Sequence, residues 1–368
     1  MRHHVIPRWA VVAAATGIIG GLFTTQPAGA DAGNALSCSP IIEGNLIHCH
    51  ITPITGIYAL ALTGTDSLLS VARGHAARQG FSINESSPLD IVAFGGNGAG
   101  SNGGTGGTAQ VFQTVAQLKA RGPALYYYIG SAGPDSTHHV NGGTATIVAT
   151  QDLTANATCV DGQEDCTTNI LAVAGGGGSS GDYNTTGGMG GVIETETGTG
   201  SEAAIAQGED GADAQFGSTV IHGGGGGGFY DETKCTDSDP GNPAGGNAGS
   251  GSAHNGNCGV GGYGGDVTGG WLNQTPGTVG NHGAGGTGAP HKWVHPASSS
   301  IWTYYGQGGG GGGGFGGGGG GGRGNTRNGG GGGGGSYSLN KVGTFTPSAP
   351  RLTTNGGLVF VFQASPPA

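Results

Sequence analysis

Residues Gly308 to Gly322 read GGGGGGGFGGGGGGG, and after a short polar spacer seven more glycines run from Gly329 to Gly335. Only Phe315 interrupts the first run. Glycine has no side chain to bury, and it loses more backbone freedom on ordering than any other residue. Such a tract is either a flexible linker or backbone packed closely against other backbone. The rest of the chain favours packing, and a linker is the alternative for these last two tracts.

The composition is that of neither a disordered chain nor a collagen. Glycine supplies 89 of the 368 residues, 34% are hydrophobic and only 9% are charged. Disordered chains are usually highly charged and poor in apolar groups, so this chain has the material for a core. Collagen needs glycine at every third residue, and that strict period is missing. The net charge is −10 with 12 Lys plus Arg, which argues against nucleic acid as a partner.

The N-terminus has the pattern of an export signal. Arg2 and Arg8 precede an apolar stretch from Ala10 to Phe23. Ala28-Gly29-Ala30 then follows as a small-residue cleavage signature. We therefore predict a signal peptide over residues 1–30, cut after Ala30. A membrane anchor is the alternative, but the stretch is shorter than the roughly 20 apolar residues that span a bilayer. We expect no membrane span in the mature chain and a secreted, extracellular or cell-surface location.

Export favours disulfides over free thiols. The six cysteines fall into three local pairs: Cys38 with Cys49, Cys159 with Cys166, and Cys235 with Cys258. We expect nearest neighbours to pair, although six cysteines allow fifteen connectivities. Cys49 between His48 and His50 suggests a metal site as an alternative, but no further ligands stand at zinc-like spacing. We expect neither a metal nor a cofactor.

Short apolar stretches bounded by Gly, Asn or Asp predict β-strands throughout the chain. The predicted strands are Thr55 to Thr63, Leu89 to Phe94, Thr108 to Val115, Ala124 to Ile129, Thr144 to Ala149, Asn169 to Ala174, Ser218 to Ile221, Ile301 to Tyr305 and Leu358 to Gln363. No long segment has helical periodicity, and Gln113 to Arg121 is too short to override the β pattern around it. The sequence therefore predicts an all-β sandwich of short strands.

Glycine tracts lie between these strands: Gly95 to Gly107, Gly175 to Gly191, Gly223 to Gly228, Gly259 to Gly270, Gly308 to Gly322 and Gly329 to Gly335. Collagen needs glycine at one position in three because one face of each extended helix meets a crowded axis. Glycine at every position implies crowding on every face. An extended helix bonds nothing internally, so its N–H and C=O groups must pair with neighbouring segments. We expect a packed bundle of polyglycine II helices beside the β-sandwich.

The ordered set of apolar stretches resembles the extracellular glycine-rich region of the anaplastic lymphoma kinase and leukocyte tyrosine kinase receptors. It is carried by Ile91 to Gly98, Gly106 to Ala109, Leu125 to Gly133, Ile170 to Gly178, Gly223 to Tyr230, Gly314 to Gly316 with Gly329 to Tyr337, and Gly357 to Phe362. The resemblance implies a tumour-necrosis-factor-like β-sandwich packed with a polyglycine helix bundle over residues 86–363. Residues 31–85 are then an N-terminal β lead-in with a disulfide, and residues 364–368 a tail.

Catalysis is not expected. The receptors' kinase motifs, Val-Ala-Ile-Lys, His-Arg-Asp and Asp-Phe-Gly, are missing from this sequence, so kinase activity does not carry over. Gly177 to Gly181 fits the Gly-x-Ser-x-Gly nucleophile pattern. That pattern needs a following helix in an α/β sheet, whereas more glycine follows here.

Two functions from different classes remain. The first is a secreted or cell-surface recognition module that binds an unknown protein or glycan, with Trp271, Trp293 and Trp302 as partner contacts, because aromatic residues often anchor interfaces. The same three residues could instead fill the core or cap the bundle. The second is a structural glycine-rich protein of a cell wall or matrix. A binder is expected to be monomeric or a closed oligomer, whereas a structural protein is expected to self-associate.

Overall fold

The computed structural model describes residues 36–39, 44–52, 57–133, 135–136, 139–140, 142–151, 169–181, 185–194, 196–198, 203–216, 219–221, 267–268, 292–294, 303–305, 311–314, 329–345 and 354–366. The predicted signal peptide, residues 1–30, lies outside these ranges. So do Cys159, Cys166, Cys235 and Cys258, whose predicted pairing stays a prediction.

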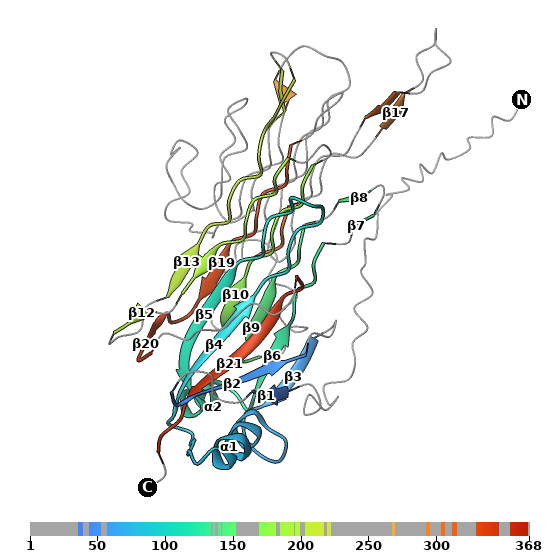
Figure 1. Ribbon diagram of the computed structural model, residues 1–368. Coiled ribbons are helices and arrows are strands. Elements are labelled where there is room, and N and C mark those ends of the chain that lie inside the picture. The colour runs from blue at the N-terminus through green and yellow to red at the C-terminus, as the bar shows by residue number, and fades with distance from the viewer. Residues whose placement is uncertain are drawn as a thin grey trace, which may run out of the picture.

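Two six-stranded sheets form the body of the protein (Figure 1). The first has the order β1 (Leu36–Cys38), β2 (Leu46–Ile51), β21 (Gly357–Gln363), β4 (Pro88–Phe94), β5 (Thr108–Thr114) and β11 (Val192–Ile193). The second has the order β13 (Ala204–Ala206), β19 (Ser336–Ser338), β10 (Ile170–Ala174), β9 (Thr146–Ala149), β6 (Ala124–Tyr128) and β3 (Ile57–Ala61). All neighbours pair antiparallel except β11 and β5, which run parallel.

Four small sheets complete the strand inventory of the described residues. They are β12 (Glu196–Thr197) with β20 (Val342–Gly343), β14 (Ala214–Phe216) with β15 (Thr219–Ile221) and β16 (Val267–Thr268), β17 (Lys292–Val294) with β18 (Thr303–Tyr305), and β7 (Asp135–Ser136) with β8 (His139–Val140). Every strand segment predicted above overlaps an observed strand. The all-β class is therefore confirmed.

One hydrophobic core lies between the two large sheets. Ile91, Val111 and Phe360 of the first sheet belong to the same buried cluster as Leu125 and Val148 of the second. Side chains alternate between the two faces of a strand, so each strand contributes every second residue to this core. The apolar residues on the facing sides of these strands thus account for the stacking of the two sheets.

The structure contains two helices, and the expectation that Gln113 to Arg121 follows the surrounding β pattern is wrong. Helix α1 (Leu68–Arg78) begins at Ser67, whose Oγ accepts a hydrogen bond from the N–H of Ser70 at 3.2 Å. Helix α2 (Val115–Arg121) begins at Thr114 with a capping box, in which the Thr114 side chain and Gln117 satisfy each other's backbone N–H groups. Such caps satisfy donors that have no partner within the helix. Two local capping signals therefore override the surrounding β pattern.

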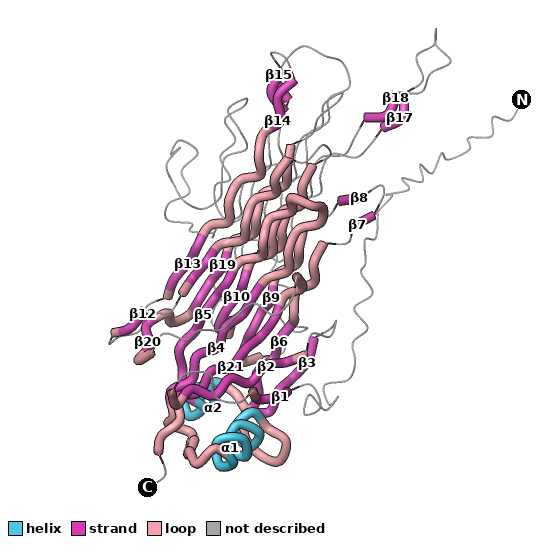
Figure 2. The backbone as a smooth tube through the Cα atoms, in the orientation of Figure 1, coloured by secondary structure: helices cyan, strands magenta, loops and turns pink. Residues whose placement is uncertain are grey.

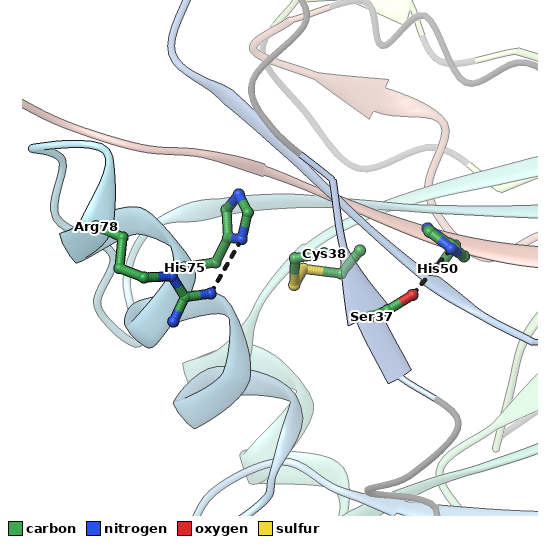
Figure 3. Close-up of a disulfide and its surroundings, with 6 residues drawn as sticks. Ser37, Cys38, His50, His75 and Arg78 are labelled. Atoms are coloured by element: carbon green, nitrogen blue, oxygen red, sulfur yellow. Dashed lines mark hydrogen bonds between the residues drawn. A yellow bond between two sulfur atoms is a disulfide. The ribbon is translucent and has the colours of Figure 1, made fainter.

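Helix α1 and a disulfide close the end of the core that carries the C-terminus (Figure 1). Leu68, Leu69 and Ala72 of α1 join the main core cluster. Beside them, the predicted Cys38–Cys49 disulfide is confirmed, and it links directly opposed residues of β1 and β2 (Figure 3). This end is fastened by apolar packing and a covalent bond, whereas the opposite end continues into glycine.

Candidate functional site: the glycine array

Glycine segments prolong the large strands beyond the point where the sheet ladders end. Figure 2 shows them as extended runs that leave the strands and lie side by side. We call them the glycine segments: 95–98 after β4, 103–107 before β5, 142–144 before β9, 175–180 after β10, 187–191 before β11, 311–314, and 329–335 before β19. The strands hold one end of every segment except 311–314, so the array inherits its alignment from the two sheets.

Segment 175–180 lies at the centre of the array. Its Gly176, Gly177 and Gly178 N–H groups donate to the carbonyl oxygens of three different segments, at Gly313 (2.6 Å), Gly96 (2.9 Å) and Gly188 (2.8 Å). Their own carbonyl oxygens accept from three more, at Gly334, Gly143 and Gly104, each at 2.8 Å. Three donated and three accepted bonds thus tie three consecutive residues to six different segments.

The hydrogen bonds between two segments recur at every third residue. Gly187 and Gly190 donate to Asn102 and Thr105, each at 2.9 Å. The same interval separates Gly188 and Gly191, which donate to Gly331 and Gly334, and Gly330 and Gly333, which donate to Ala212 and Glu209. Backbone groups in a β-strand alternate between two sides with a period of two. A repeat of three directs successive backbone groups to three sides.

Close backbone approach explains why these positions are glycine. A Cβ added at Gly177 would overlap the carbonyl oxygen of Gly104, and one at Gly176 would overlap that of Gly143. Comparable overlaps arise at Gly95, Gly175, Gly178, Gly312, Gly333 and Gly334. In each case the obstacle is backbone, which cannot rotate away as a flexible side chain could. Glycine is therefore required here by space.

Burial along a segment reveals how deep it lies in the array. Every residue of 175–180, 311–314 and 329–335 is buried. In contrast, Thr186, Met189 and Val192 are exposed while the glycines between them are buried. Met189 is 43% and Val192 55% exposed, and these are the largest exposed apolar side chains of the described residues. A segment with side chains at one position in three is packed on its other two sides.

An outermost segment, which we call the edge segment, spans 206–213. Its Gly208 and Gly211 are buried and stand three apart, whereas the other residues from 207 to 213 are exposed. It lies beside the previous segment, because the Glu209 N–H donates to the Met189 carbonyl oxygen at 2.7 Å. One buried glycine in three residues means that a single side faces the array. The number of glycines per three residues thus falls from the centre to the edge.

These segments carry exposed side chains, which together we call the outer face. It comprises Thr105, Thr186, Met189 and Val192, with Gln207, Glu209 and Asp210 of the edge segment beside them. Its chemistry is mixed: hydroxyl groups, two apolar side chains and, along the edge segment, carboxylates. The backbone of Thr105, Thr186, Met189 and Glu209 is hydrogen-bonded to neighbouring segments, so the backbone beneath these side chains is held in place.

The aromatic residues predicted to contact a partner are not brought together in the described part of the chain. Trp293 lies in β17, where its backbone is opposite Tyr304 of β18. Trp271 and Trp302 lie outside the described residues. The outer face was missed by the sequence reasoning. Its signal is the spacing of Asn102, Thr105 and Thr108, and of Thr186, Met189 and Val192, which stand three residues apart among glycines.

Among the described residues, the ionisable groups with a perturbed pKa lie on α1 and in the second sheet. Burial, and secondly the neighbouring Arg78, lower the pKa of His75 on α1, and the backbone of Ser39 opposes this shift. Burial and then Tyr58 raise the pKa of the core residue Tyr127, which keeps its hydroxyl neutral. Among the described residues, no group of three or more His, Cys, Asp or Glu side chains is placed to hold a metal ion.

No protein-family model matches the chain, and no curated protein matches it either. Within the described residues, no helix has the length and apolar character needed to cross a membrane.

Proposed function

We propose that this protein is a secreted or cell-surface recognition module without catalytic activity. In this proposal the two sheets form a tumour-necrosis-factor-like sandwich, and the glycine segments are polyglycine II helices packed as a bundle. The three-residue hydrogen-bond repeat supports the helices, because an extended helix of this type has three residues per turn. The resemblance to the receptors' glycine-rich region supports the sandwich and the binding role.

The single observation that carries the proposal is the way the bundle ends. On the outer face, side chains such as Thr105 and Met189 occupy the room in which a further glycine segment would pack. The edge segment continues this trend, with glycine at only one position in three. Lateral addition of more polyglycine is therefore blocked on this side. A bundle that stops growing and offers a rigid, chemically mixed face suits recognition of a protein or glycan.

A structural role in a cell wall or matrix is the second candidate. The uninterrupted glycine of 311–314 and 329–335 favours it, because exposed polyglycine would pair with further chains. All residues of these two segments are buried within one chain, however. Many of their backbone groups are hydrogen-bonded within the chain, for example by the bond from the Gly312 N–H to the Gly332 carbonyl oxygen at 2.8 Å. This leaves recognition as the better-supported function.

The proposal is tested by binding to arrays of defined glycans and of purified extracellular proteins. The wild-type protein is compared with a Met189→Lys/Val192→Lys variant, which alters the outer face at two exposed positions. An Ala77→Lys/Ala120→Lys variant, changed at exposed positions of α1 and α2, is the matched control. We expect one class of probe to bind the wild type and the control but to lose about tenfold or more of its affinity for the outer-face variant.

Sedimentation of the same three proteins separates the two candidate functions. A recognition module remains a monomer or a closed oligomer, such as a dimer, and does not grow further as its concentration rises. Growth into assemblies of increasing mass, together with probe binding that ignores the outer-face substitutions, would contradict the proposal and favour the structural role.

A further inference from the structure

The two large sheets have four edge strands, and three of them are very short. β1 has 3 residues, β11 has 2 and β13 has 3, whereas β3 has 5. An edge strand presents a row of unpaired backbone groups, and proteins protect such edges by shortness, charge, proline or a bulge. β3 reads Ile-Tyr-Ala-Leu-Ala and has no charge and no proline. Its register with β6 is also unbroken. β3 thus carries none of the four protections.

The register shows which backbone groups of β3 face away from the sheet. Leu62, just after the strand, donates its N–H to the Pro123 carbonyl oxygen at 3.2 Å. Hydrogen-bonded residues alternate along an antiparallel pair, so Leu60 and Tyr58 also bond toward β6, opposite Leu125 and Tyr127. The N–H and C=O groups of Ile57, Ala59 and Ala61 therefore point outward from the edge.

We propose that two copies of this chain pair antiparallel through β3, with a two-fold axis at Ala59. With Ala59 opposite Ala59 of the second copy, Ile57 of each strand meets Ala61 of the other. All three outward-pointing residues are then in hydrogen-bonded register at once. A two-fold interface requires a self-complementary surface, and the spacing of these residues about Ala59 provides one.

The side chains around β3 suit a second copy of the same strand. No charge lies on β3, so self-pairing brings no like charges into opposition. Ala59 and Ala61 are small, and the half-buried Tyr126 lies on the same face, opposite Ala59. Aromatic side chains reach diagonal neighbours across a sheet, so Tyr126 can extend the apolar contact beyond the paired strands. The β3-containing sheets of the two copies then join into one continuous sheet in a closed dimer.

Sedimentation velocity over a range of concentrations tests the proposal, on the purified protein with its Cys38–Cys49 disulfide intact. The key variant is Ala59→Lys, which places two like charges opposite each other at the axis. Its control is Ala77→Lys, the same change at an exposed position of α1. We expect a monomer–dimer equilibrium for the wild type and the control, and a dissociation constant raised about tenfold or more by Ala59→Lys.

Ala59→Pro provides a second, independent variant. Proline removes the outward N–H of residue 59 but no bond to β6, and edge strands tolerate proline when that N–H faces solvent. Circular dichroism verifies that both variants keep the wild-type fold. Weakened dimers in both variants support the proposal. A wild-type protein that is monomeric at every concentration overturns it, as does a folded Ala59→Lys or Ala59→Pro variant that dimerises as tightly as the wild type.

Discussion

Gly177 has backbone on every side. Its N–H donates to Gly96, its carbonyl oxygen accepts from Gly143, and a Cβ would overlap the carbonyl oxygen of Gly104. We predict that Gly177→Ala lowers the free energy of unfolding by about 3 kcal/mol or more, because rigid backbone must move apart. Urea denaturation measures the change.

Gly74 on α1 is the matched control for that substitution. A Cβ there would meet only the Arg78 side chain, at 3.9 Å. Glycine in a helix interior costs about 1 kcal/mol relative to alanine, so Gly74→Ala is expected to raise the free energy of unfolding by about that amount. Equal effects of the two substitutions would show that Gly177 is not closely packed.

His75 makes stability depend on pH. Burial and Arg78, whose Nη2 lies 3.4 Å from His75 Nδ1, lower the pKa of this imidazole in the folded state (Figure 3). In the unfolded chain it binds a proton near pH 6.5. Below that pH the unfolded state binds more protons, so the free energy of unfolding falls as the pH drops toward the folded pKa. Above the pKa of the unfolded state, the contribution of His75 to the free energy of unfolding does not change with pH.

We predict that His75→Gln loses less stability than the wild type between about pH 7 and pH 5, the range that spans the unfolded pKa. Thermal denaturation at several pH values provides the measurement. His50→Gln controls for the loss of an imidazole on the neighbouring strand β2. A His75→Gln variant with the full wild-type pH dependence would refute the assignment of this pH dependence to His75.

The segment 186–192 gives a prediction at the level of the element. Single alanine substitutions at Thr186, Met189 and Val192, which are exposed, should change the free energy of unfolding by about 0.5 kcal/mol or less. The same substitution at Gly187, Gly188, Gly190 and Gly191 should cost several times more, because each Cβ would overlap backbone. Chemical denaturation of the seven variants would reveal a period of three. A period of two would indicate an ordinary β-strand.

Strands were predictable from the sequence because their signal is local. Short apolar stretches bounded by turn residues located β4, β5 and β21 almost to the residue. β2 was not predicted, although in Leu-Ile-His-Cys-His-Ile the apolar Ile47, Cys49 and Ile51 alternate with His48 and His50. Both helices were missed because their cap residues, Ser67 and Thr114, outweighed weak local patterns.

The glycine array was predictable in kind but not in arrangement. Tracts of glycine imply close backbone packing, yet which tract lies at the centre depends on partners far apart in sequence, such as Gly178 and Gly331. The spacing of the non-glycine residues in a segment does indicate how deeply that segment is buried in the array. This spacing can be recognised once the three-residue repeat is known. The confirmed disulfide, in contrast, joins cysteines only 11 residues apart, so nearest-neighbour pairing sufficed.

At the scale of the whole molecule, the two ends of the body differ in what holds them together. One end is closed by α1, the Cys38–Cys49 disulfide and a hydrophobic core. In the glycine array there are few side chains to bury, so hydrogen bonds between segments must offset a backbone entropy cost of about 1–2 kcal/mol per residue. Anchoring by β4, β5, β10 and β19 reduces that cost by aligning the segments in advance. The array is therefore expected to unfold together with the sheets.

Amide hydrogen exchange of the glycine segments tests the central claim most directly. If they form a hydrogen-bonded array continuous with the sheets, the amides of 176–178 and 330–334 will be protected nearly as strongly as those of the central strands β4 and β21. Exchange of these glycines at the rate of an unstructured peptide, with the strands still protected, would contradict the account.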